Sequence, residues 1–120
     1  MISVIVPVKS EGVEVAARFS RFSRPPEAEL IVADGGVEEP VRETLRAAGA
    51  RLLSGNGSRG SRLARAAAGA RGEILFFVHA DSRPPDDAIE IIRRATDRRQ
   101  TAASGWRRPS ASGIRAGAGV

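Results

Sequence analysis

The sequence has no cysteine, which excludes disulfide bonds, thiolate metal sites and thiol nucleophiles. Only 4% of its 120 residues are aromatic, so aliphatic side chains must form most of the core. No apolar run approaches the roughly 20 residues that span a bilayer, and the first residues lack the basic stretch of a signal peptide. We therefore expect one small cytoplasmic domain, and nothing in the sequence indicates membrane association.

Excess charge is absent from most of the chain. All 14 acidic residues precede residue 98, together with 14 of the 19 basic ones, so the net charge of +5 comes from residues 98–120. A sequence pI near 11.3 would normally suggest a nucleic-acid partner. Because residues 1–97 are neutral overall and poor in aromatics, we expect no nucleic-acid partner.

Apolar runs of strand length alternate with segments of helical periodicity. Strands are expected at 2–8, 30–33, 50–53 and 73–78, and helices at 13–22, 38–48, 62–70 and from about Asp86. This alternation predicts an α/β fold, a Rossmann-like parallel sheet with helices on both faces, formed by residues 1–97. Residues 98–120 are rich in Arg, Ala, Gly and Ser and have no periodicity. We expect them to form a disordered basic tail, in which only Trp106 docks.

Three loops follow strand ends in this prediction, at 7–12, 34–37 and 79–85. Each contains an acidic residue. Open parallel sheets bind ligands beyond the carboxyl ends of their strands. The sequence therefore predicts a ligand site where these three loops meet.

The third loop follows the buried run "EILFFV" with the chain's only histidine, His79, then Ala80 and Asp81. A carboxylate in this place can bind Mg²⁺ or Mn²⁺, which then neutralises phosphate oxygens of a nucleotide. His79 is a second candidate, either as a metal ligand or as a phosphate contact. The alternative is that the pair only caps a turn.

Asp34 and Gly35 follow the second strand, in "LIVADGG". An aspartate at this point of a parallel sheet often accepts hydrogen bonds from a ribose or base, and the glycines let the backbone approach a ligand. The alternative is that "DGG" only builds a turn. Glu11, after the first strand, is either a further ligand contact or the start of a helix.

The segment "SGNGSRGSR" places Arg59 and Arg62 at the start of a helix, where backbone N–H groups suit a diphosphate. Solvated arginines are the alternative. Neither common nucleotide-binding glycine motif is present, and no G-x-S-x-G accompanies the histidine, so a hydrolase triad is not supported. A nucleotidyltransferase would need a glycine-rich basic loop after the first strand, where only Lys9 is basic. No catalytic residue is assigned.

Together these motifs resemble the nucleotide-sugar half of a family-two glycosyltransferase with the GT-A fold. "ISVIVPVKSEG" resembles the opening strand and its Pro-x-x-Asn-Glu element, and "LIVADGG" the second strand with its Asp-Gly-Gly signature. "ARGEILFFVHADSRPP" resembles the Arg-Gly-Asp/Glu element, the next strand and the Asp-x-Asp-type motif in its His-Ala-Asp-Thr/Ser form. That form is typical of a bacterial subgroup linked to arsenosugar biosynthesis.

The resemblance implies a metal-dependent transferase that moves a sugar from a nucleotide-diphosphate sugar to an unknown acceptor. It implies Asp81 as the ligand of Mg²⁺ or Mn²⁺ and Asp34 as the residue that binds the base. The nucleotide-sugar contacts that we expect are Pro7, Val8, Glu11, Asp34, Gly35, Arg59, His79 and Ala80.

The resemblance covers residues 1 to about 95. Ser10, Val37 and Ala64 depart from its usual residues, and nothing after Arg98 resembles the acceptor half that supplies the catalytic base. We therefore expect a truncated or frameshifted product. The alternative to a transferase is a non-catalytic or degenerate nucleotide-binding fragment.

Overall fold

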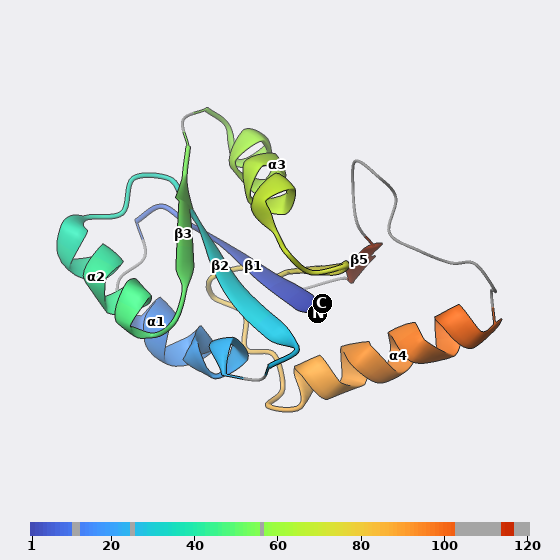
Figure 1. Ribbon diagram of the computed structural model, residues 1–120. Helices are drawn as coiled ribbons and strands as arrows, with labels where there is room; N and C mark the ends of the chain where they lie inside the picture. Colours follow the sequence, from blue (N-terminus) through green and yellow to red (C-terminus); the bar gives the residue numbers. More distant parts are fainter. Residues whose placement is uncertain (11–12, 25, 56, 103–113, 117–120) are drawn as a thin grey trace.

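The computed structural model of the chain describes residues 1–10, 13–24, 26–55, 57–102 and 114–116. One all-parallel sheet, with strand order β3-β2-β1-β4-β5, runs through it. This architecture confirms the predicted α/β fold (Figure 1). In chain order the elements are β1 (Ile2–Val8), α1 (Glu14–Phe19), the 3₁₀ helix η1 (Ser20–Ser23), β2 (Ala28–Asp34), α2 (Glu39–Ala47), β3 (Arg51–Ser54), α3 (Arg59–Gly69), β4 (Ile74–Phe77), α4 (Ala88–Ala102) and β5 (Ile114–Ala116).

The central strand β1 is buried along its whole length, as expected for an apolar run covered on both faces. Its residues alternate between two separate cores. Val4, Val6 and Val8 belong to a core with α1, α2 and α4, whereas Ile5 packs against α3 in the other. Figure 1 shows the same division, with α3 alone on its side of the sheet.

The strand register decides where the loops meet. Val8, the last residue of β1, pairs with Asp34, the last residue of β2. The pairing of β4 with β1 ends earlier, at Phe77 opposite Ile5. The segment that follows β4 therefore runs beside the end of β1, at the edge where a parallel sheet binds its ligands.

The first helical segment differs from the single helix expected over 13–22. Its α-helix ends at Phe19, and η1 continues from Ser20. Phe19 and Phe22 are both fully buried, with ring centroids 6.2 Å apart. In a 3₁₀ helix, side chains three residues apart lie directly above one another, so the tighter turn keeps both rings on the core side.

Two further helices begin at residues other than those predicted from the sequence. The third helix begins at Arg59 rather than Arg62, because the Ser58 hydroxyl caps it by accepting a hydrogen bond from Ser61 N at 3.1 Å. The fourth begins at Ala88 rather than near Asp86, after a turn in which Ala88 N donates to the Pro85 carbonyl.

Part of the expected tail has regular backbone structure. Helix α4 continues to Ala102, and 114–116 form β5, which pairs parallel to β4. The other residues of that range, among them Trp106, lie outside the described residues. In the part of the chain that the structure describes, no helix is long and apolar enough to cross a membrane.

Candidate functional site

A pocket of about 460 Å³ opens at the carboxyl ends of β1 and β4. The chain leaves β1 toward β2 on one side, and β4 flanks β1 on the other. This is the point where the strand order reverses, and it is the usual ligand site of an open parallel sheet. The pocket is lined by Pro7, Lys9, Ser10, Arg59, Arg62, His79, Ala80 and Asp81.

Three segments that are distant in sequence supply these lining residues. One is the end of β1 with the residues directly after it, one is the first turn of α3 and one follows β4. Three of the side chains are cationic, namely Lys9, Arg59 and Arg62, whereas Asp81 is the one carboxylate that lines the pocket among the described residues. The pocket therefore favours an anionic ligand.

Arg59 and His79 both line the pocket and contact each other, with Arg59 Nη2 2.6 Å from His79 Nδ1. A guanidinium has donors only, so the histidine Nδ1 must be the acceptor in this contact. The neutral imidazole then carries its proton on Nε2. His79 is exposed, which leaves this N–H as a donor for a ligand.

Arg62 is the least exposed cation of the pocket, at 9% of its accessible surface. Its Nε is buried and has no hydrogen-bond partner among the described residues. The group lies against the backbone of Gly35, where an added Cβ would be 2.7 Å from its Cζ. The absence of a side chain at Gly35 therefore makes room for Arg62.

Two arginines outside the pocket hold the segment after β4. Arg18 Nη1 donates to the Ala80 carbonyl, and Arg21 Nη2 donates to the Pro84 carbonyl at 2.6 Å. Arg21 also lies over the Phe22 ring, 4.5 Å from its centroid. These contacts attach the loop that carries His79 and Asp81 to α1 and η1.

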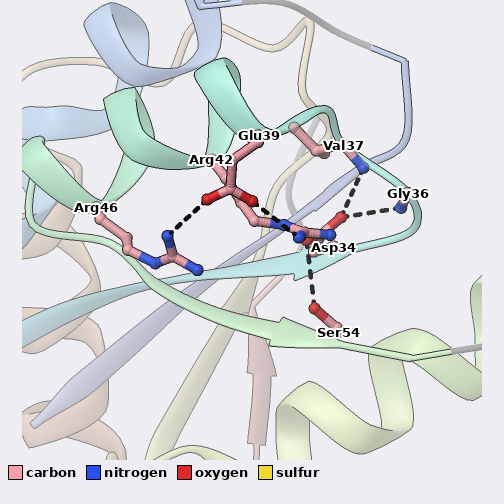
Figure 2. Close-up of polar contacts among 7 residues, drawn as sticks. All are labelled: Asp34, Gly36, Val37, Glu39, Arg42, Arg46 and Ser54. Atoms are coloured by element: carbon pink, nitrogen blue, oxygen red, sulfur yellow. Dashed lines mark hydrogen bonds and ion pairs between the residues drawn. The ribbon is translucent and has the colours of Figure 1, made fainter.

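Asp34 is 1% exposed and is enclosed by its own surroundings (Figure 2). Its Oδ1 accepts hydrogen bonds from Gly36 N at 2.9 Å and Val37 N at 2.8 Å. Its Oδ2 accepts from Arg42 Nε at 2.7 Å and from Ser54 Oγ at 3.3 Å. A carboxylate offers about four lone-pair positions, so these four donors occupy its capacity.

The same contacts control the charge of Asp34. Burial by itself raises the pKa of the carboxyl, but the backbone hydrogen bonds from Val37 and Gly36 and the charge of Arg42 outweigh it. The net effect is a lowered pKa, and Arg42 has a correspondingly raised pKa. Asp34 is therefore held ionised as an acceptor for its own loop.

The structure brings together five of the residues expected at the site, namely Pro7, Arg59, His79, Ala80 and Asp81. Val8, Asp34 and Gly35 are not among the described residues that line the pocket. Val8 is buried, and its carbonyl accepts a hydrogen bond from Gly35 N at 2.8 Å. The expected contact of Glu11 falls outside the described residues.

Sequence reasoning did not assign Lys9, Ser10, Arg18 or Arg21 to the site. Lys9 is the only lysine of the chain, and its place directly after a buried strand was a usable signal. No local signal identifies Arg18 and Arg21, because their partners lie 62 and 63 residues away.

The pocket suits a metal ion that is coordinated partly by the protein and partly by the phosphate groups of a ligand. No group of three or more histidine or acidic side chains lies close enough together, among the described residues, to hold an ion by itself. Asp81 is exposed and lines the pocket. Magnesium-type ions are often bound by one or two carboxylates plus substrate phosphates, so one aspartate beside an anion pocket fits this pattern.

Neither a scan against protein-family models nor a search of curated proteins found a match. Solved structures do resemble the chain. A crystal structure of a mycobacterial protein has a TM-score of 0.67 and 27% identity, and the match covers 80% of this chain and 36% of that one.

Glucosyl-3-phosphoglycerate synthase from Mycobacterium tuberculosis, a GT-A-type glycosyltransferase, is also similar. Its complex with Mn²⁺, UDP and phosphoglyceric acid has a TM-score of 0.63 and 25% identity. Its complex with Mn²⁺, UDP-glucose and phosphoglyceric acid has a TM-score of 0.61 and 26% identity. Each match covers 75% of this chain and 36% of the other. The chain thus shares the parallel sheet of these structures and spans about a third of their length.

Proposed function

We propose that the pocket between β1 and β4 binds the diphosphate of a nucleotide sugar, and that the chain is the donor half of a family-two-like glycosyltransferase. The observation that carries the proposal is the convergence of Lys9, Arg59 and Arg62 on one pocket at the reversal of strand order. Likeness to a transferase solved with UDP-glucose and Mn²⁺ supports it.

The residues of the pocket have distinct parts in this proposal. Lys9 and Arg59 neutralise phosphate oxygens, which stabilises the diphosphate as the bond to the anomeric carbon of the sugar breaks. The His79 Nε2–H donates a hydrogen bond to the same group. Asp81 would hold Mg²⁺ or Mn²⁺, which would supply Lewis-acid stabilisation of the diphosphate leaving group.

An acceptor must attack the anomeric carbon while the nucleoside diphosphate leaves. No described carboxylate other than Asp81 lines the pocket, so the described residues offer no separate carboxylate base there for the acceptor hydroxyl. This observation favours a second candidate function, in which the chain binds the donor without transferring the sugar. The acceptor, the cytoplasmic location and the absence of a nucleic-acid partner stay predictions.

Isothermal titration with UDP-glucose, with and without Mn²⁺, tests donor binding. We expect Mn²⁺ to strengthen binding, and Asp81→Asn to weaken binding about tenfold in Mn²⁺ but not in its absence. The control is Asp87→Asn, an exposed carboxylate that does not line the pocket. The proposal would be contradicted if UDP-glucose did not bind, or if its affinity were unchanged both by Mn²⁺ and by Asp81→Asn.

Release of UDP in the presence of an acceptor separates a transferase from a binding fragment. Phosphoglyceric acid is the first acceptor to try, since the similar synthase was solved with it. UDP that accumulates faster with the acceptor than without it supports transfer. Metal-dependent binding without such release supports the donor-binding fragment instead.

A further inference from the structure

Arg62 is buried on the wall of the pocket, and its Nε has no hydrogen-bond partner among the described residues. The residue is 9% exposed. Removing a charged group from water is costly unless the group is paired and hydrogen-bonded. A buried arginine on the wall of a pocket, whose Nε finds no partner among the described residues, indicates that a ligand supplies one.

The surroundings of Arg62 define the chemistry of that ligand. Lys9 and Arg59 line the same pocket, so the missing partner is anionic. Arg62 lies in the first turn of α3, an 11-residue helix, where the helix dipole also favours negative charge. A guanidinium pairs best with a group that accepts two parallel hydrogen bonds, as phosphate does. A diphosphate supplies enough oxygens for all three cations.

Among the described residues, the expected contact of the base is Asp34, which is not free for a ligand. The Asp34 carboxylate is the acidic group at the end of β2, but Gly36, Val37, Arg42 and Ser54 already occupy it (Figure 2). It does not line the pocket in the described part of the chain. A base would have to displace Arg42 before it could hydrogen-bond to this aspartate.

We infer that this site recognises its donor through the diphosphate and not through the base, and that the diphosphate forms an ion pair with the buried guanidinium of Arg62. The inference rests on the proposed function for the identity of the natural ligand. It also assigns a role to Gly35, whose lack of a side chain lets the guanidinium approach within 2.7 Å of the position of a Cβ.

Titration with inorganic pyrophosphate, UDP, GDP and uridine in Mg²⁺ tests the inference. We expect pyrophosphate, UDP and GDP to bind within about fivefold of one another, and uridine not to bind. Arg62→Met should weaken all three phosphate ligands by about tenfold or more. The matched control is Arg65→Met, one turn later on α3, whose side chain bonds to the Ser54 carbonyl and does not line the pocket.

Unfolding without ligand provides a readout that a purely structural arginine would not give. Because no described residue offers the buried Arg62 Nε a hydrogen bond, Arg62→Met should leave the unfolding midpoint unchanged or raise it. Gly35→Ala should weaken pyrophosphate binding by displacing the guanidinium, and should have no further effect in the Arg62→Met background. A lowered midpoint in Arg62→Met, with unchanged pyrophosphate affinity, would overturn the inference.

The outcomes separate this inference from the proposed function. If UDP-glucose binding depends on Mn²⁺ and Asp81 but is unaffected by Arg62→Met, or if UDP binds far tighter than GDP and pyrophosphate, the inference fails and the function stands. If pyrophosphate binding depends on Arg62 but no nucleotide sugar binds, the phosphate site stands and the function fails. If none of the phosphate ligands binds, both fail.

Discussion

Replacing Asp34 tests whether this aspartate acts through the loop amides or through its charge. Asp34→Ala removes both hydrogen bonds to Oδ1. The Gly36 amide is in an exposed residue and can be rehydrated, but Val37 is 5% exposed, so its N–H loses its partner in a buried position. Leaving a buried donor unpaired costs about 1–3 kcal/mol, and the lost bond to Gly36 adds to this. We expect Asp34→Ala to lower the free energy of unfolding by about 2–3 kcal/mol.

Asp34→Asn is the matched variant. The amide oxygen of asparagine can still accept from Gly36 N and Val37 N, and its NH₂ group can donate to Ser54 Oγ. Only the contact with Arg42 becomes unfavourable, and the Arg42 side chain is 30% exposed, so it can turn toward water. Asp34→Asn should therefore lower the free energy of unfolding much less than Asp34→Ala does.

Urea unfolding at neutral pH, followed by circular dichroism, measures both variants against the wild type. The slope of free energy against urea should stay constant, so that a change of midpoint reports stability alone. A destabilisation by Asp34→Asn as large as that by Asp34→Ala would refute this reasoning. It would mean that the ion pair with Arg42, and not the capture of the loop amides, holds this end of β2.

The remaining predictions concern acid stability, a close backbone contact and the loop after β4. Burial raises the pKa of Glu29, but hydrogen bonds led by that from Ser3 outweigh it and lower the pKa. The stability that the ionised Glu29 contributes should be present above the ordinary glutamate pKa and lost as the pH falls through the lowered pKa of the folded state. Urea unfolding at a series of acid pH values measures this decline, and Glu29→Gln should make it shallower. Gly72→Ala should destabilise by about 1–3 kcal/mol in urea unfolding, because its Cβ would lie 2.8 Å from Ser3 N. Arg21→Met should speed hydrogen exchange at Ser82 and weaken UDP binding, and unchanged exchange there would contradict its role in holding the loop through Pro84.

Much of the fold was predictable because its signals are local. The run of apolar residues in β1 predicted a strand buried on both faces, with the observed bounds Ile2–Val8. The alternation of such runs with helical patterns predicted the parallel sheet. The errors fall at helix boundaries, such as the cap at Ser58, where one side-chain hydrogen bond decides where the helix starts.

The site was predictable only in part. The rule that ligands bind beyond strand ends placed His79 and Asp81 at the edge where the pocket lies. The same rule placed Asp34 at the site beside Asp81, although one is enclosed by four donors and the other is exposed. Burial and hydrogen-bond partners depend on residues far away in sequence, which a motif does not contain.

By itself, the sequence determined the order of strands and helices, the edge of the sheet that carries polar residues, and the types of side chain available there. Those properties follow from periodicity and from residues close in the chain. Only the tertiary structure decided that Lys9, Arg59 and Arg62 share one pocket, that the buried Arg62 Nε has no partner among the described residues, and that the Asp34 carboxylate is occupied. The physical reason is that charge pairing and desolvation are set by the packing of distant segments.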